Sequence, residues 1–313
     1  MCLGYFQDSE EELDMEYCDR HNLQVIRREQ GGGAVYIDSN QLFVQWIFHP
    51  DKLPLNVAQR FRLFTEPIIE TYKKLGVQAY FYPVNDVHVN GKKIVGTGAA
   101  RIGEAEVVTG NFLFDFDFEA MIKALKVPDE GFRNDFAESL RDYLTTINIE
   151  LEDPPAEEVV KETYVTVCEK VLGRKLVPGE FTDKEIQKMK SLDQKMQSTE
   201  WLYQYRKPGK NTRMVKVHAG VYVGTGTYPN ISGQGSLRVR MNGNRIERLS
   251  IKRTSDFSKK FGPKLEEILT GALLEHEDLS ERTSVLNLNN PEEEEIKHIL
   301  EEIIEISRRK PGT

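Results

Sequence analysis

The chain has 313 residues and a formal net charge of −8, and 39% of its residues are hydrophobic while 29% are charged. This composition is that of an ordinary globular protein, and the length is enough for about two domains. No apolar run approaches the ~18 residues of a membrane span, the first residues lack the features of a signal peptide, and the three cysteines have no metal-ligand spacing. We therefore expect a cytoplasmic protein with reduced cysteines and no membrane partner.

The first 206 residues predict an α+β domain. Strands are expected at residues 25–26, 35–37 and 42–48, and a helix at 55–75 carries apolar side chains at helical spacing. Four more strands are expected at residues 79–82, 86–89, 94–101 and 106–116, followed by helices at 132–144, 156–172 and 183–196. This order predicts a largely antiparallel mixed sheet with flanking helices.

A Lys-Pro-Gly-Lys run near residue 207 marks a linker, which divides the chain into domains of residues 1–206 and 207–313. The second domain predicts a small α+β fold, with strands at 214–223, 235–241 and 245–251 and a helix at 263–274. The last helix is predicted to have Asn290 as its N-cap and Pro291 in its first position, and its apolar stripe is expected to dock on the rest of the domain.

Positive charge is concentrated in the second domain. Nine basic and two acidic residues lie between positions 238 and 264. No aromatic stacking residues or known motif accompany them, so we expect no nucleic-acid partner. Two interpretations stay open: a solvated strand face, or a surface that attracts an acidic protein partner.

Three consecutive glycines, Gly31, Gly32 and Gly33, follow the paired arginines Arg27 and Arg28 at the end of an expected strand. Each glycine costs roughly 0.5–1 kcal/mol against alanine in an ordered element, so a triplet indicates a need for bare backbone. Backbone N–H groups beside guanidinium groups form a site for phosphate or carboxylate. The alternative is a plain glycine-rich loop.

A second pattern begins at Asn85-Asp86. Asn90-Gly91 between apolar runs predicts a hairpin with a type I′ turn, which places Lys93 two residues into the returning strand. The following Gly96-Thr97-Gly98-Ala99-Ala100 run has almost no side-chain volume, so a bulky ligand could lie against it. The alternative for Lys93 is a solvated hairpin lysine.

At these residues the chain resembles the lipoate–protein ligase A family of the biotin/lipoate protein ligase superfamily. The matching motifs are Arg-Arg-x-x-Gly-Gly-Gly-Ala-Val-Tyr-x-Asp, from Arg27 to Asp38, and Asn85-Asp86 followed by Lys93-x-x-Gly96. Residues 110–115 and 200–203 resemble later segments, the second being the family's closing strand, so the resemblance covers roughly residues 3–206. The chain departs from the family at Gln30, Ile37 and Thr109, where serine and two histidines are common, and lacks the family's usual first strand and helix.

The resemblance implies a biotin/lipoate ligase-like catalytic domain with an accessory C-terminal domain. It implies an enzyme that uses ATP and Mg²⁺ to activate lipoate or octanoate as an acyl-adenylate. The acyl group would pass to a lysine of an acceptor lipoyl domain, in an E2 subunit or the glycine-cleavage H protein. We expect a monomer.

The implied site residues fall into overlapping groups around the catalytic candidate Lys93. The residues implied to bind ATP or acyl-adenylate are Arg28, Gly31, Gly32, Gly33, Ala34, Val35, Tyr36, Asn85, Asp86 and Lys93. Those implied to line the lipoate pocket are Gly32, Gly33, Lys93, Gly96, Thr97 and Gly98. Asp86 is a candidate Mg²⁺ ligand, although a structural cap is an equal alternative.

Other activities use different residues. Related acyltransferases form a thioester on cysteine, but Cys168 lies on an expected helix and core packing is the favoured interpretation. Biotin ligases use an arginine-rich glycine loop that this chain lacks. An octanoyl or lipoyl transferase, a biotin ligase and a non-catalytic lipoyl-binding homologue are the alternatives. His88, on the Asp86 strand, is either pocket lining or surface.

Overall fold

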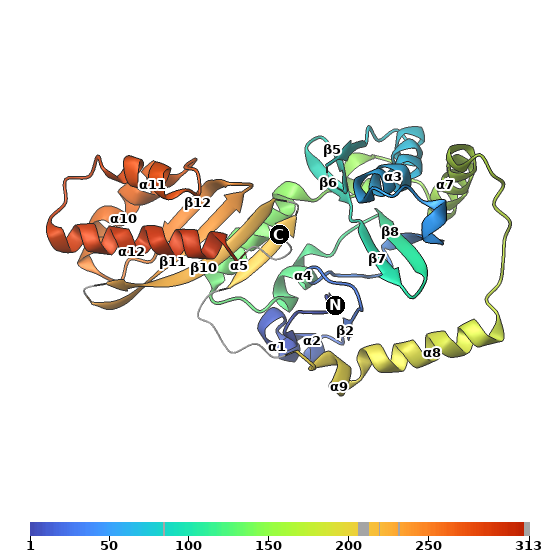
Figure 1. The fold of residues 1–313 in the computed structure, drawn as a ribbon, viewed down its shortest axis with the longest axis horizontal. Coiled ribbons are helices and arrows are strands. Elements are labelled where there is room, and N and C mark those ends of the chain that lie inside the picture. Colours follow the sequence, from blue (N-terminus) through green and yellow to red (C-terminus); the bar gives the residue numbers. More distant parts are fainter. Residues whose placement is uncertain (84, 206–212, 219, 231, 310–313) are drawn as a thin grey trace. The chain divides into compact units, whose positions relative to one another are not determined.

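The computed structural model describes residues 1–83, 85–205, 213–218, 220–230 and 232–309 (Figure 1). The predicted linker at 207–210 lies outside them. The chain forms two compact units. Unit 1 comprises Met1–Phe6, Cys18–Met121 and Arg141–Gln204, and unit 2 comprises Gln7–Tyr17, Ile122–Leu140 and Tyr205–Thr313. In the described part of the chain, no helix is both long and apolar enough to cross a bilayer.

Unit 1 contains three small sheets. Strand β1 (Cys2–Leu3) pairs in parallel with β2 (Ile26–Arg27). The second sheet has the antiparallel order β3 (Gln41–Phe48), β8 (Ala105–Leu113), β7 (Gly98–Ile102). The third has the antiparallel order β4 (Tyr80–Tyr82), β5 (Asp86–Val89), β6 (Lys92–Val95). These strands and their helices confirm the α+β, largely antiparallel prediction.

Three predictions for this unit were wrong in detail. The strand expected at 94–101 is broken into β6 and β7 in different sheets, because the Gly96 N–H turns to the Asn111 side chain (3.0 Å). Residues 35–37 join the structure through a β-bridge between Cys2 and Val35. The expected closing strand at 200–203 is instead the short helix α9 (Thr199–Leu202), which the Ser198 side chain caps.

The main helix of unit 1, α3 (Val57–Lys74), packs one face against the sheets. Its Phe64, Ile68 and Tyr72 are fully buried together with Phe112 of β8. The other helices outside the C-terminal part are η1 (Pro50–Lys52), α1 (Ser9–Glu12), α2 (Met15–Arg20), α4 (Phe118–Ala124), α5 (Glu130–Tyr143), α6 (Ile147–Glu150), α7 (Glu157–Leu172) and α8 (Asp183–Gln197). Helix α7 packs on α3, which completes this core.

The C-terminal part of unit 2 is a four-stranded antiparallel sheet backed by helices (Figure 1). The strand order is β12 (Arg245–Ile251), β11 (Gly233–Asn242), β10 (Val221–Asn230), β9 (Met214–His218). The helices are α10 (Asp256–Leu269), α11 (His276–Thr283) and α12 (Asn290–Ser307). Three predictions for this part were wrong in detail. The single strand expected at 214–223 is two antiparallel strands, β9 and β10, because the chain turns back at Gly220, whose φ is +82°. Helix α10 begins at Asp256, seven residues before the expected start, with Ser255 as its cap, and Asn289 rather than Asn290 caps α12.

The basic residues between positions 238 and 264 are largely paired within unit 2. The pairs are Arg238 with Asp129 and Asp135, Arg240 with Glu247, Arg248 with Asp135 and Glu138, Arg253 with Glu266, Lys260 with Glu292 and Lys264 with Glu267. Because these carboxylates already neutralise most of the face, the pairing favours a structural role over a free surface for an acidic partner.

Gly110 in β8 is required by the packing of α3. A Cβ at this position would lie 2.9 Å from the Phe64 ring and 3.2 Å from Ile68. We expect Gly110→Ala to destabilise the protein by about 1–3 kcal/mol, because overpacking forces such a core to shift. Urea unfolding measures the effect, with Gly179→Ala as the control, since a Cβ there meets no atom within 4 Å. Equal stability of the two variants would contradict this account.

Candidate functional site

The glycine loop curls around the Arg28 side chain. Its guanidinium donates to the carbonyls of Gly31 (2.7 Å), Gly33 (2.9 Å) and Cys2 (3.1 Å). In a planar trans peptide the C=O and the following N–H point in opposite directions. The N–H groups of Gly32 and Ala34 therefore point away from Arg28. Arg28 holds the loop from the inside, which leaves these N–H groups on the outer side.

Packing against the protein explains only part of the glycine triplet. Gly32 has a φ of +96°, which favours glycine. Its carbonyl also lies so close to Gly4 that a Cβ on Gly4 would overlap it. At Gly31 and Gly33, by contrast, a Cβ would meet no described atom within 4 Å. Packing within the described residues therefore does not require glycine at these two positions. The space beside them is open, so a ligand could approach the backbone there.

Arg27 and Arg28 have different roles, which the sequence did not distinguish. Arg27 is fully buried, and its guanidinium donates to the carbonyls of Gly4, Tyr5, Trp201 and Leu202. The Trp201 indole donates in return to the Arg27 carbonyl (3.0 Å). Arg27 thus fastens α9 to β2 and supports the loop from behind.

The next two predicted residues of the loop are held by the backbone. Val35 uses both its N–H (3.0 Å) and its C=O (2.8 Å) in the bridge to Cys2. The Tyr36 carbonyl accepts a bond from Gln41 (3.1 Å), and its ring lies edge-on to Phe116. Of the loop amides, those of Gly32 and Ala34 are therefore better placed for a ligand than that of Val35.

The Lys93 hairpin has the predicted geometry. Asn90 and Gly91 have φ values of +50° and +80°, as a type I′ turn requires. Lys93 Nζ lies 2.7 Å from Asp86 Oδ1, and the side chains are 20% and 1% exposed. The second oxygen, Asp86 Oδ2, is buried without a hydrogen-bond partner among the described residues. A buried carboxylate with one free oxygen can bind a second cation or donor.

His88 is buried close to this pair rather than exposed at the surface. It is 3% exposed, is the cross-strand partner of Lys93 and stacks on Tyr82, with 4.2 Å between ring centroids. Burial lowers the pKa of His88 from its ordinary value of 6.5, and the Lys93 charge lowers it further. Asp86 and a hydrogen bond to the Gly91 backbone oppose that shift. The imidazole is therefore neutral at pH 7.

Hydrogen bonds with the side-chain amides of Asn85 and Asn111 hold the small-residue segment, residues 96–98, against its neighbours. Asn85 Nδ2 donates to Thr97 Oγ1 (3.0 Å), and the Thr97 hydroxyl donates to the Asn85 carbonyl. Asn111, which the sequence analysis did not select, accepts from the Gly96 N–H. The sequence signal that could have identified Asn111 is its position as a polar residue in the otherwise apolar end of β8. Gly98 follows at the start of β7, where a Cβ would contact Thr109 at 3.4 Å.

The structure thus forms two groups within unit 1. One is the loop of residues 28–34 around Arg28, and the other is the hairpin with Asn85, Asp86, Lys93 and the 96–98 segment. The hydrogen bonds and the ion pair described above hold each group internally. The loop presents backbone N–H groups suited to an anion. The hairpin presents the Lys93 amine, suited to an anion, and the free oxygen of Asp86, suited to a cation.

All three cysteines are buried, and each is a free thiol. Cys168 is 2% exposed in the core formed by α3 and α7, where burial raises the pKa of its thiol. A thiol with a raised pKa is a poor nucleophile at neutral pH. The core interpretation of Cys168 is therefore confirmed.

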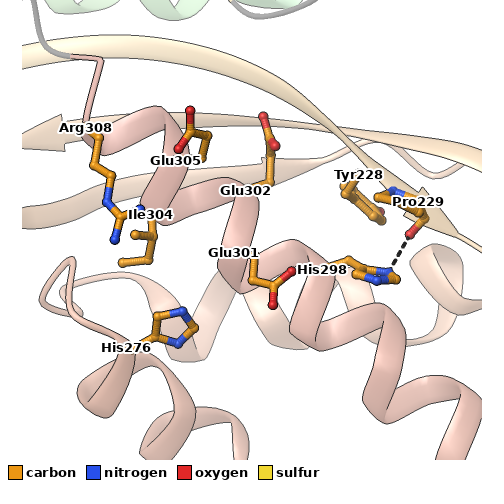
Figure 2. A pocket seen from close by; sticks show the side chains of 9 residues that line it. All are labelled: Tyr228, Pro229, His276, His298, Glu301, Glu302, Ile304, Glu305 and Arg308. Carbon is orange, nitrogen blue, oxygen red and sulfur yellow. Dashed lines mark hydrogen bonds between the residues drawn. The ribbon is translucent and has the colours of Figure 1, made fainter.

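A pocket of about 520 Å³ lies in unit 2, apart from the predicted site residues. It is lined by Tyr228, Pro229, His276, His298, Glu301, Glu302, Ile304, Glu305 and Arg308 (Figure 2). Three acidic side chains of α12, Glu301, Glu302 and Glu305, line it together with the C-cap residue Arg308, and the His298 ring lies 3.3 Å from the Pro229 carbonyl. Within the described residues, no group of three or more potential ligands could hold a metal ion.

The family model of the lipoyl protein ligase A/B catalytic domain matches residues 1–167. The chain belongs to the lipoyl protein ligase A/B family. It is similar to lipoate–protein ligase 1 of Staphylococcus aureus, with 29% identity over 212 residues that cover 67% of this chain and 62% of that protein. It is also similar to the octanoyltransferase LipM of Halalkalibacterium halodurans, with 26% identity over 228 residues that cover 64% and 82%.

The fold is that of the same family. The structure resembles the bipartite lipoate protein ligase of Thermoplasma acidophilum, solved in a study that included its E2 lipoyl domain, with a TM-score of 0.60 and 27% identity. The match covers 66% of this chain and 81% of that one. The biotin/lipoate ligase fold expected for this family is therefore confirmed, and ligases and transferases both occur among its relatives.

The ion pair of this lipoyl ligase family member has a testable energetic consequence. Removing Lys93 leaves the buried Asp86 carboxylate without its counter-charge, so we expect Lys93→Met to cost about 3 kcal/mol of stability. Lys93→Met combined with Asp86→Leu removes both charges and should cost less than the single change. Guanidinium unfolding of the wild type and of both variants measures this difference. A double variant less stable than the single one would contradict the assigned ion pair.

His88 predicts a pH dependence of stability. Its folded pKa is lowered, so below about pH 6.5 the unfolded chain binds a proton that the folded chain does not. Stability should therefore fall as the pH drops through the window below pH 6.5. We expect His88→Gln to flatten this slope in urea unfolding between pH 5 and pH 8. An unchanged slope would show that the imidazole is not kept neutral by the fold.

Proposed function

We propose that the chain is an ATP-dependent lipoate–protein ligase. It would activate lipoate or octanoate as an acyl-adenylate and transfer the acyl group to a lysine of an acceptor lipoyl domain. The observation that carries the proposal is the half-buried Lys93, paired with Asp86 beside the small-residue segment 96–98. Burial of every cysteine supports this mechanism over acyl transfer through a thioester.

Activation requires two anions to meet. The carboxylate of the acid attacks the α-phosphorus of ATP, and pyrophosphate leaves as the bond between the α- and β-phosphates breaks. Two unit charges at ~4 Å repel by about 4 kcal/mol at an effective dielectric near 20. Lys93 would bind the carboxylate and a phosphate oxygen together. The outward N–H groups of Gly32 and Ala34 would bind the acyl-phosphate, and the Arg28 guanidinium would add positive charge behind them. Donors placed in advance typically contribute about 10²–10³-fold each.

Asp86 fits the proposed Mg²⁺. Magnesium in nucleotide sites is usually held by one or two carboxylates together with substrate phosphates and water. The free Oδ2 of Asp86 supplies one such oxygen, while Oδ1 stays on Lys93. The ion would neutralise phosphate charge during activation. Asn85, bonded to Thr97, would fix the start of this strand.

In the second step, the amine of the acceptor lysine attacks the acyl carbon and AMP leaves with the bonding electrons. The amine has an unperturbed pKa of about 10.4, so it must lose a proton before it attacks. Lys93 would stabilise the charge that develops on the acyl and phosphate oxygens. The lipoyl chain would extend along Gly96, Thr97 and Gly98, with Gly32 and Gly33 on its other side.

An octanoyltransferase is the second candidate, because the chain is also similar to LipM. Such an enzyme requires a reactive cysteine, and the buried Cys168 with its raised pKa does not offer one. A biotin ligase or a non-catalytic lipoyl-binding homologue is less well supported, since neither explains the matched ligase motifs together with the charged Lys93–Asp86 site.

The remaining expectations are proposals of the same kind. The acceptor would be the lipoyl domain of an E2 subunit or the glycine-cleavage H protein. The enzyme would be a cytoplasmic monomer with a catalytic domain, 1–206, and an accessory domain, 207–313.

The decisive test is an ATP-dependent mass increase on a recombinant lipoyl domain or H protein. Lipoate, octanoate and biotin are offered separately to the wild type, to Lys93→Ala and to Lys73→Ala, an exposed lysine on α3. We expect adducts with lipoate and octanoate, a loss of at least about 10²-fold in Lys93→Ala, and wild-type activity in Lys73→Ala. An adduct that forms from octanoyl carrier protein without ATP would support the transferase instead.

A further inference from the structure

The backbone of Lys93 is held from two sides. On one side it pairs with His88 of β5. On the other, Leu144 forms a parallel β-bridge to Lys93, and the Thr145 N–H donates to the Lys93 carbonyl (2.9 Å). The segment after α5 therefore acts as an outer neighbour of the lysine strand, and its position helps to determine where the Lys93 side chain begins.

One carboxylate connects this segment to the turn of the hairpin. Glu150, the last residue of α6, accepts from the Thr145 hydroxyl through Oε1 (2.6 Å) and from the Asn90 side-chain amide through Oε2 (3.0 Å). Asn90 is a turn residue of the β5–β6 hairpin, and Thr145 is the residue that bonds to Lys93. We call these three residues, Asn90, Thr145 and Glu150, the clamp.

The segment that carries Thr145 and Glu150 is itself firmly held. Thr145, Thr146 and Ile147 are fully buried. The Thr146 side chain caps α6 by accepting from the Ile149 N–H (3.3 Å), and the Asn148 N–H donates to the Phe114 carbonyl (3.0 Å) just beyond β8. Because α6 is fixed at its start, Glu150 projects from a defined place toward the turn. Hydrogen bonds to an ionised carboxylate are shorter and stronger than neutral ones.

We infer that Glu150 is a positioning residue for Lys93, which fixes the register of the hairpin against the 144–145 segment through Asn90 and Thr145. This inference rests on the proposed function, since it concerns the reaction that Lys93 would assist. Glu150 would act on Lys93 through other residues, since its side-chain hydrogen bonds go to Asn90 and Thr145. Its loss should loosen the turn and displace the Lys93 amine from the carboxylate and phosphate oxygens that it would bind.

Four variants separate this role from a general effect on the fold. Glu150→Ala removes both bonds, whereas Glu150→Gln can accept from Asn90 and donate to the Thr145 hydroxyl, which can rotate to accept. Asn90→Gly removes one bond and keeps a residue that tolerates the positive φ of the turn. Glu152→Ala changes an exposed carboxylate two residues away and serves as the matched control.

The kinetic readout is lipoate-dependent ATP–pyrophosphate exchange by the full chain. Because a misplacement of about 1 Å can cost up to about 10²-fold, we expect Glu150→Ala to lower kcat by about tenfold with little change in the KM for lipoate. Glu150→Gln and Glu152→Ala should stay within about twofold of the wild type. Asn90→Gly should slow the reaction, and its combination with Glu150→Ala should be no slower than Glu150→Ala alone.

Amide hydrogen exchange tests the clamp without substrate. In Glu150→Ala the Thr145 amide should exchange at least about tenfold faster, while the amides of β8 keep their protection, because the opening is local. Wild-type kcat in Glu150→Ala with unchanged Thr145 exchange would overturn the inference. If the wild type showed no ATP–pyrophosphate exchange with either lipoate or octanoate, the proposed function would fail. The clamp would still be tested by amide hydrogen exchange in Glu150→Ala: faster exchange of the Thr145 amide would establish it, and unchanged exchange would refute it.

Discussion

The geometry of the hairpin site depends on the ion pair between Lys93 and Asp86. A carboxylate that is 1% exposed is costly unless a charge and hydrogen bonds compensate it, so the hairpin must keep the amine at 2.7 Å. This requirement explains the positive φ values at Asn90 and Gly91, because only a tight turn returns the strand with Lys93 on the face of Asp86. His88, buried near the pair and stacked on Tyr82, has its pKa lowered first by burial and then by the Lys93 charge.

The two arginines of the glycine-loop motif both bind backbone carbonyls, and each holds a different part of the structure around the loop. Arg27 is buried against four carbonyls and ties β2 to α9, whereas Arg28 turns two loop carbonyls inward and so leaves the N–H groups of Gly32 and Ala34 facing outward. A guanidinium suits both positions because its fixed fork of donors can satisfy several acceptors at once. The anion-binding character expected of the loop therefore depends on a cation that acts first on the protein's own backbone.

Local signals predicted the parts of this molecule that local chemistry determines. The Asn90-Gly91 turn, the helical stripe of α3 and the burial of Cys168 were correct because turn geometry and apolar spacing are short-range. The break between β6 and β7 was missed because it depends on Asn111, fifteen residues from Gly96. The helix at α9 was missed because Ser198 offers a cap that competes with the strand implied by the resemblance. Glu150 left no signal, since its partners Asn90 and Thr145 meet only in the fold.

Ligases and transferases share this fold, so the chemistry must be decided by which nucleophile the fold exposes. A transferase needs a thiolate, and here each thiol is buried, with Cys168 further disfavoured by the raised pKa of its thiol. What the fold does present is a lysine on a strand with small neighbours, a carboxylate with one free oxygen, and outward loop amides. These groups stabilise negative charge on phosphate and carboxylate oxygens and form no covalent bond with the acyl group. These features support activation through a nucleotide, which is the chemistry proposed above.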